Sequence, residues 1–142
     1  MDKNYDFTAV PHGYALCLYP SCTHSEKCIR HLLTSHLPSD MEYLSIINPK
    51  CTGTDCRYFA PDRQVRYARG FTRIFDEVPF AKVRDIRQIL LRRYGKELYY
   101  RYRRGTYPIP PKEQQYIETV FQTQGLTHQL RFDSYEDNYE WR

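Results

Sequence analysis

The sequence lacks an apolar run that could cross a membrane, since no window approaches the roughly 18 apolar residues that a span needs. It also lacks the amino-terminal pattern of a secretory signal, a basic stretch followed by an apolar one. These absences predict a protein that neither spans a membrane nor is exported. We therefore expect it in the cytoplasm, where thiols stay reduced and a disulfide framework is disfavoured.

The sequence has none of the common catalytic signatures. Only six of its 142 residues are glycine, and none forms a glycine-rich phosphate loop or a nucleophile elbow. No pair of carboxylates stands beside a histidine in a recognised motif. These absences favour a non-enzymatic protein, and an enzyme ranks third behind two binding functions.

Cysteine is absent after residue 56, although five cysteines come before that point: Cys17, Cys22, Cys28, Cys51 and Cys56. The spacing is C-x4-C-x5-C for the first three and, after 22 intervening residues, C-x4-C for the last two. These gaps are wider than those of a CxxC knuckle, but clustered thiols in a reducing compartment still indicate a metal site. Zinc and iron–sulfur clusters both take four thiolates, so the ligand count admits either metal.

The predicted ligands are the three cysteines nearest the amino terminus and the last one, Cys17, Cys22, Cys28 and Cys56. Cys51 is the alternative fourth ligand. Cys56 is preferred because the aromatic residues that follow it, Tyr58 and Phe59, can shield a thiolate from water, whereas Cys51 lies in a polar stretch.

Other interpretations of the cysteines stay open. Free cysteines are often buried as small apolar residues, in which case no metal binds. Cys28 and His31 lie three apart on an expected helix, an arrangement that suggests a nucleophile and its base. The nearby histidines are expected to be surface or hydrogen-bonded residues, because enough thiolates are present without them: His24, His31 and His36.

The front of the chain is expected to contain one helix and one or two short strands. A helix is predicted from Thr23 to about Ser35, with Thr23 and Glu26 forming a capping box. The β-prone run 43–47 predicts a short strand, and a second strand is expected around residues 14–18.

The back of the chain shows helical periodicity. A weak apolar stripe over 65–75 suggests one helix, and a clearer stripe that starts at Phe80 predicts a helix between Pro79 and Gly95. Pro111 and Gly125 frame another helix. The sequence thus predicts an α+β fold, mainly α, in one domain (1–142) with a soft division into a Cys-rich front (1–61) and a basic helical back (62–142) of three to four helices. The acidic, aromatic end of the chain is expected to be docked.

Charge is distributed unevenly along the chain. Residues 63–104 contain thirteen lysines and arginines but four acids, whereas residues 1–62 contain five basic and seven acidic residues. The back therefore carries a positive field that attracts phosphate-rich partners. Its densest part is the segment 99–104, Tyr-Tyr-Arg-Tyr-Arg-Arg, and rings beside guanidinium groups suit stacking on bases and contact with phosphates.

The order of elements gives a second indication of nucleic-acid binding. A helix ending at Gly95, a short helix over 97–103, a turn at Gly105 and a closing helix resemble the latter half of a helix-turn-helix domain. The usual pattern has a small residue and an apolar one where this chain has Leu91 and Arg101. The predicted contact residues for DNA or RNA lie in the basic segment: Tyr100, Arg101, Arg103 and Arg104. Alternatively, Tyr94, Leu98 and Tyr102, four apart on a helix, face the core, and Arg101 and Arg104 form a solvated face paired with the acidic tail.

Several segments together resemble a family of uncharacterised small bacterial proteins, a domain of unknown function. They are the first three cysteines, 48–59, 66–71 and 99–105. The resemblance covers nearly the whole chain and implies a bacterial, full-length, single-domain protein. It carries no known activity and assigns no functional residue.

Two functional hypotheses follow. The first is a cytoplasmic, non-enzymatic protein in which a cysteine-bound metal, zinc or an iron–sulfur cluster, organises the front while the back binds DNA or RNA in a regulatory role. The second is a protein–protein adaptor that has structural cysteines without metal and uses its tyrosines and arginines as an interface.

Overall fold

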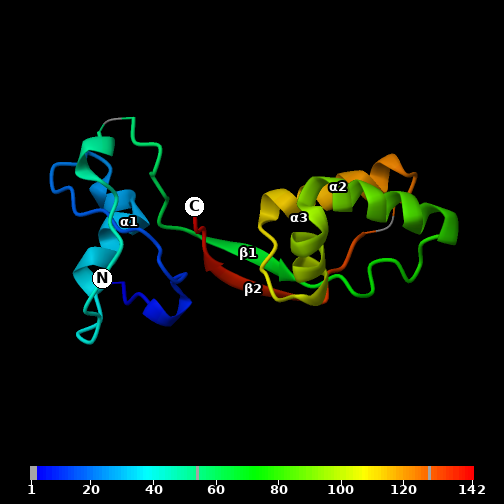
Figure 1. Cartoon of the computed structure of the whole chain (residues 1–142), viewed down its shortest axis with the longest axis horizontal. Coiled ribbons are helices and arrows are strands. Elements are labelled where there is room, and N and C mark those ends of the chain that lie inside the picture. The colour runs from blue at the N-terminus through cyan, green and yellow to red at the C-terminus, as the bar shows by residue number, and fades with distance from the viewer. Residues whose placement is uncertain (1–2, 54, 128) are drawn as a thin grey trace. The chain divides into compact units, whose positions relative to one another are not determined.

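The computed structural model describes residues 3–53, 55–127 and 129–142 and divides the chain into two compact units (Figure 1). Unit 1 comprises Met1–Gln64 and Tyr139–Arg142, and unit 2 comprises Val65–Asn138. The division expected after residue 61 falls close to this boundary, but the last four residues belong with unit 1. The described elements give an α+β fold that is mainly α, which confirms the predicted class. None of the described helices has the length and hydrophobicity of a membrane span.

Unit 1 has little regular structure. Its elements are single turns of helix, namely η1 (Phe7–Ala9), η2 (Ser25–Lys27), α1 (Ile29–Leu32), η3 (Leu33–His36) and η4 (Pro49–Cys51). The deepest residues of its core are Ile29, Leu33 and Ala60. A unit of this size with so small a core commonly depends on a metal, a disulfide or a partner for its stability.

The prediction of one continuous helix from Thr23 to about Ser35 is wrong. The segment is broken into η2, α1 and η3, because Cys28 is extended and its backbone bridges to Pro61. The predicted capping box does not form, since the residue that caps η2 is His24 and its side chain makes no capping hydrogen bond.

The two strands predicted in unit 1 are not formed. Their segments are joined only by one parallel bridge, between Leu16 and Ile46, among the described residues. Hydrogen bonds from Leu16 N to the Ser45 oxygen and from Ile47 N to the Leu16 oxygen, each 2.9 Å, define this bridge. The second segment cannot extend the pairing because Pro49 begins η4 two residues after Ile47. The bridge still brings the start of the cysteine-bearing region beside residues 45–47.

Unit 2 begins with a strand rather than with the helix expected over 65–75. Strand β1 (Gln64–Arg69) pairs with β2 (Ser134–Tyr139), which is formed by the acidic tail. The pairing is antiparallel, since Asp133 N donates to the Gly70 oxygen at one end and Glu140 N donates to the Arg63 oxygen at the other. The helical stripe was misleading. Ala68 and Phe71 are buried and Phe75 is half-buried, but they lie on a strand and the turns that follow it.

The helices of unit 2 follow the predicted stops. Helix α2 (Phe80–Arg104) is interrupted at Gly95, whose φ of 74° and ψ of 162° are not helical, and it ends at Gly105 with φ 80°. Helix α3 (Pro111–Thr123) begins with the expected proline. The predicted core position of Phe80 is wrong, because this first residue of α2 is 92% exposed. The deepest core residues on the two helices are Ile86, Leu90, Tyr99, Ile117 and Phe121.

Gly70 is a position where we expect substitution to be costly. Its φ is +78°, and a Cβ built there would stand 2.5 Å from Asp133 Oδ2. That oxygen accepts hydrogen bonds from Thr72 N and Thr72 Oγ1, so it cannot withdraw without breaking both. Gly70→Ala should therefore lower the free energy of unfolding by about 1–3 kcal/mol, measured by urea denaturation.

Gly95→Ala is the matched control for that substitution. Gly95 has nearly the same φ, +74°, but nothing lies within 4 Å of the Cβ position. Both variants place an L residue at a positive φ, and the clash adds only to Gly70→Ala. Equal losses in the two variants would show that the contact with Asp133 has no energetic weight.

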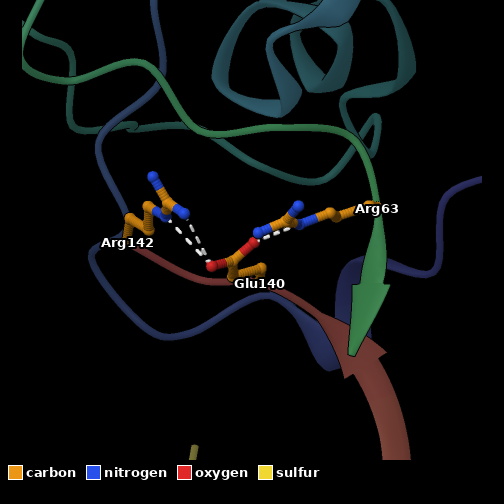
Figure 2. Close-up of polar contacts among 3 residues, drawn as sticks. All are labelled: Arg63, Glu140 and Arg142. Atoms are coloured by element: carbon orange, nitrogen blue, oxygen red, sulfur yellow. Dashed lines mark hydrogen bonds and ion pairs between the residues drawn. The ribbon is translucent and has the colours of Figure 1, made fainter. Parts of the chain in front are cut away.

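The tail is docked in unit 1, as the sequence predicted. Tyr139 and Trp141 pack against the unit 1 core, and the Tyr14 and Trp141 rings meet edge-on at 5.0 Å. Glu140 lies between two arginines (Figure 2) and accepts hydrogen bonds from Arg63 Nε at 2.5 Å and Arg142 Nη2 at 2.8 Å. Because Trp141 is the single tryptophan of the chain, its fluorescence reports on unit 1.

Docking of the tail should be sensitive to acid. The hydrogen bond from Arg63 lowers the pKa of Glu140 below its ordinary value of 4.5, burial opposes this, and Arg142 adds to the lowering. A lowered folded-state pKa contributes stability above about pH 4.5 that is lost as the pH falls through the folded value. Denaturation followed by Trp141 fluorescence should show that stability falls less below pH 4.5 in Glu140→Gln than in the parent protein. Glu42→Gln, at an exposed position, should leave the acid sensitivity unchanged, and identical curves for all three proteins would contradict this assignment.

Candidate functional site

Four cysteines from three separate segments line one small cavity in unit 1. They are the four predicted metal ligands, Cys17, Cys22, Cys28 and Cys56. Cys17 and Cys28 are buried, and the other two are half-buried. The first and the last are 39 positions apart in sequence, so the fold rather than local chain geometry gathers them.

The backbone explains how the cysteines come together. Cys17 follows the bridge residue Leu16, and its N–H donates to the Arg30 carbonyl at 3.0 Å. Cys28 is held by its own bridge to Pro61, while Phe59 N donates to the Cys56 carbonyl at 3.2 Å in a tight turn. The positions of these sulfurs thus follow from main-chain pairing rather than from side-chain packing alone.

Polar groups around the cavity make hydrogen bonds with two of the cysteines. His24 N lies 3.4 Å from Cys22 Sγ and donates to it, the kind of amide–sulfur bond that stabilises a thiolate ligand. His31 Nδ1 lies 3.1 Å from the Cys17 carbonyl oxygen. Both histidines border the cavity, whereas His36 does not and instead contacts the Leu32 carbonyl.

Cys51 lies apart from the other four cysteines. It is exposed at the end of η4 and is not among the residues that line the cavity. Within the part of the chain that the structure describes, no three His, Cys, Asp or Glu side chains stand in an arrangement that could hold a metal ion. The four cysteines share a cavity without converging on one point.

Arg30 is a neighbour of this cavity that the sequence did not single out. Its side chain borders the cavity, and the residue is only 8% exposed. Arginine is rarely so buried, and no Asp or Glu side chain of the described residues pairs with it. It lies two residues after Cys28, in the segment predicted to be helical. A charged side chain there is expected to be exposed, so the sequence gave no sign that Arg30 is buried.

Unit 2 presents a second candidate surface on residues 96–104, the part of α2 after Gly95. Tyr99 and Tyr102 are buried in the core and anchor this segment; the alternative interpretation predicted this for Tyr102 but not for Tyr99. Residues three or four apart share one face of a helix. One such face carries Lys96, Tyr100, Arg103 and Arg104, of which Lys96 and Arg104 are exposed and the other two are half-buried, with Tyr100 packed against the core cluster.

The predicted nucleic-acid residues differ in their availability. Arg101 Nη2 pairs with Glu97 Oε1 at 2.6 Å, and its guanidinium lies 5.0 Å from the centre of the Tyr107 ring. Arg103 and Arg104 have no acidic partner within the described residues. Lys96 has none either, and the sequence pattern could have indicated it, because it stands four residues before Tyr100.

The acidic tail neutralises arginines of the strand rather than those of the helix. Arg66 pairs with Asp137 at 3.3 Å, and Arg69 pairs with Glu136 at 2.9 Å. The expected pairing of the tail with Arg101 and Arg104 is wrong, because the tail becomes a strand beside β1. The acidic residues of β2 therefore do not neutralise the cations of residues 96–104.

The first turn of α3 is bonded to α2 just before Gly95. Glu113 accepts from Tyr94 Oη at 2.7 Å and from Arg93 Nε at 3.2 Å. Burial raises the pKa of Tyr94 well above its ordinary value, and the bond to Glu113 adds to this. Burial alone would raise the pKa of Glu113, but the hydrogen bonds from Arg93 and Tyr94 outweigh it and leave the pKa lowered. These contacts hold α3 against α2 next to Gly95.

Comparison with known proteins gives one match. The model of a family of unknown function, DUF6078, matches residues 1–141. No curated protein and no solved structure matches the chain.

Proposed function

Since the chain belongs to this family of unknown function, as the sequence resemblance predicted, we propose a function from its own residues. It is a non-enzymatic regulatory protein in which a cysteine-bound metal, zinc or an iron–sulfur cluster, holds unit 1 together and the basic face of unit 2 binds nucleic acid. One observation carries the first part: the four cysteines that the sequence predicts as ligands line one cavity, and Cys51 does not.

Metal binding requires the four sulfurs to turn toward a common ion. Each cysteine side chain has one rotatable bond, and a change of its χ1 angle moves the sulfur while the backbone stays in place. The hydrogen bond from the His24 backbone amide to Cys22 Sγ and the small core of unit 1 support this proposal. Binding free energy of a structural metal is folding free energy, so the metal would supply the stability that so small a core does not.

Chelation tests this part of the proposal. Incubation with a strong zinc chelator should lower the unfolding midpoint of unit 1, followed through Trp141 fluorescence, and added zinc should restore it. The reading is specific because Trp141 packs in the core of unit 1. A midpoint that neither chelator nor zinc moves would contradict a structural metal.

Nucleic-acid binding is proposed for the helical face of Lys96, Tyr100, Arg103 and Arg104. Its cations lack acidic partners within the described residues, and Tyr100 lies beside them, half-buried, with its ring edge-on to Tyr99 at 5.1 Å between ring centres. Arginine and lysine neutralise phosphates, and a tyrosine ring stacks on bases. Residues 96–104 also occupy the place of a recognition helix, between the break at Gly95 and the turn at Gly105.

Salt dependence tests this second part. A labelled single-stranded oligonucleotide and the duplex of the same sequence should both be titrated by fluorescence anisotropy at several salt concentrations. Binding should weaken steeply as salt rises, because released counterions drive the association. Absence of binding to DNA and to RNA at low salt would contradict the proposal.

A protein–protein adaptor is the second candidate function. It is favoured by large apolar residues that unit 1 exposes beside a groove, among them Met41, Tyr43 and Leu44. Exposed apolar clusters of this kind commonly mark protein contacts. An adaptor would show no salt-dependent affinity for nucleic acid and would not lose stability on chelation.

A further inference from the structure

We propose that a groove of unit 1 binds an extended peptide segment of a partner protein, one in which apolar side chains alternate with lysine or arginine. This inference rests on neither the metal nor the nucleic-acid part of the proposed function. It names the class of partner that the second candidate function leaves open.

The groove is built from two stretches of unit 1, within residues 7–16 and 41–45. Most of the residues that line it are apolar, among them Phe7, Val10, Leu16, Met41 and Leu44. Its volume is ≈ 420 Å³, within the range of about 300–1,000 Å³ that binding sites commonly have. The groove therefore has room for apolar side chains of a ligand.

Residues 39–46, which form one wall of the groove, are all exposed. Four of them are large and apolar, Met41, Tyr43, Leu44 and Ile46, and Tyr43 is 88% exposed. Clustered apolar side chains of this kind beside a cavity are typical of a contact surface rather than of a solvated loop.

The main chain of this wall is open to pairing over residues 42–44. Ile46 is bridged to Leu16, and Met41 N donates to the Pro38 oxygen. Between them, the N–H and C=O groups of residues 42–44 make no hydrogen bond to another main-chain group of the described residues, and the segment is neither helical nor in a turn. An added strand pairs with backbone groups of this kind.

The exposed charges beside the groove are of one sign. Asp6, Asp40 and Glu42 are exposed and adjacent in sequence to lining residues, whereas no lysine or arginine is. Arg30 lies 4.2 Å from the centre of the Tyr14 ring, but it is buried and bonded to main-chain oxygens. The acidic surroundings favour a basic ligand and repel the phosphates of nucleic acid.

The order of residues along the wall indicates why the ligand alternates. Met41, Tyr43 and Leu44 line the groove, whereas Asp40 and Glu42 do not. Successive side chains of a strand point to opposite faces. A peptide paired along residues 42–44 therefore presents one row of side chains to the apolar groove and the other row to the two carboxylates.

Three pools of labelled heptapeptides, titrated against the full chain by fluorescence anisotropy, test the class of partner. In the first pool, lysine alternates with valine, leucine, tyrosine or phenylalanine. The second replaces lysine by glutamate, and the third replaces the apolar residues by serine. The first should bind, and the other two should bind at least about tenfold more weakly, because like charges or missing apolar contacts oppose them. No binding by the first pool, or equal binding by all three, would overturn the proposal.

A charge reversal at the wall locates the binding. Asp40→Lys with Glu42→Lys should weaken binding of the lysine pool and strengthen binding of the glutamate pool. The matched control is Glu26→Lys with Asp55→Lys, which makes the same change of charge at exposed positions that do not line the groove. Both double variants should keep the Trp141 transition. Equal effects of the two double variants would mean that overall charge attracts the peptide, and would overturn the proposal.

N-methylated peptides test the pairing of main chains. The amides of a strand point alternately to its two sides, so only one of two peptides, methylated at alternate residues, loses its hydrogen bonds to residues 42–44. That peptide should bind about 10- to 100-fold more weakly than the other. Equal affinities of the two peptides would overturn strand addition.

Sedimentation of the protein alone tests whether a second copy occupies the groove. The parent protein should be monomeric. A dimer that Tyr43→Ser converts to monomer would make the groove an interface between copies and would overturn a peptide partner. Metal content and affinity for nucleic acid are measured separately, so none of these results decides the proposed function.

Discussion

Cys22→Ser should abolish metal binding and unfold much of unit 1, the largest effect that we expect from any single substitution. Structural zinc contributes about 10–16 kcal/mol to the folding of zinc-finger peptides, and serine is a poor replacement for a thiolate ligand. Metal content should fall from one equivalent to near zero, and the cooperative transition reported by Trp141 should disappear. Elemental analysis and fluorescence on the same preparations measure both.

Cys51→Ser is the matched control for this experiment. Cys51 is exposed and does not line the cavity, so its replacement should leave metal content and the Trp141 transition unchanged. If Cys22→Ser unfolds like the parent protein, the cysteines of the cavity are packing residues without a metal. If Cys51→Ser instead loses the metal, Cys51 is the fourth ligand and the assignment of Cys56 is wrong.

Arg103→Ala combined with Arg104→Ala should weaken nucleic-acid binding strongly while the fold persists. Loss of two phosphate contacts should reduce the salt slope by about 2 and the affinity near 0.1 M salt by roughly 50- to 100-fold. Stability should change little, because neither side chain has an acidic partner within the described residues and Arg104 is exposed. Anisotropy titrations at several salt concentrations give both quantities.

The control for this double variant removes the same net charge elsewhere in unit 2. Arg66 is paired with Asp137, and Arg131 is exposed before β2, so Arg66→Ala with Arg131→Ala lowers the total charge without touching the helical face. The control should retain most of the affinity. Comparable losses in both double variants would mean that overall charge, rather than this face of α2, attracts the nucleic acid.

The sequence predicted the features that depend on local chain geometry. Pro111, Gly95 and Gly105 mark the ends and the break of the helices because proline suits a first turn and glycine tolerates a positive φ. The shared cavity of the four cysteines agrees with the choice of Cys56 over Cys51, which rested on the aromatic residues after Cys56. Whether these cysteines hold a metal stays a prediction.

The sequence could not predict features that depend on distant pairing. Strand β1 was mistaken for a helix because Val65, Ala68 and Phe71 are three apart, although they lie on a strand and the turn after it. The acidic tail showed no strand signal, and its pairing with β1 decided which arginines are neutralised. Arg30 is buried through carbonyls 15 and 28 residues away, contacts that no local pattern encodes.

The central claim is that a metal held by the four cysteines of the cavity stabilises unit 1. Elemental analysis of anaerobically purified protein, recorded together with its visible spectrum, tests it most directly. The account predicts bound metal, either one equivalent of zinc in a colourless protein or iron with sulfide in a coloured one. A folded protein without any bound metal would contradict it. The cysteines would then be core residues of a unit that no metal stabilises.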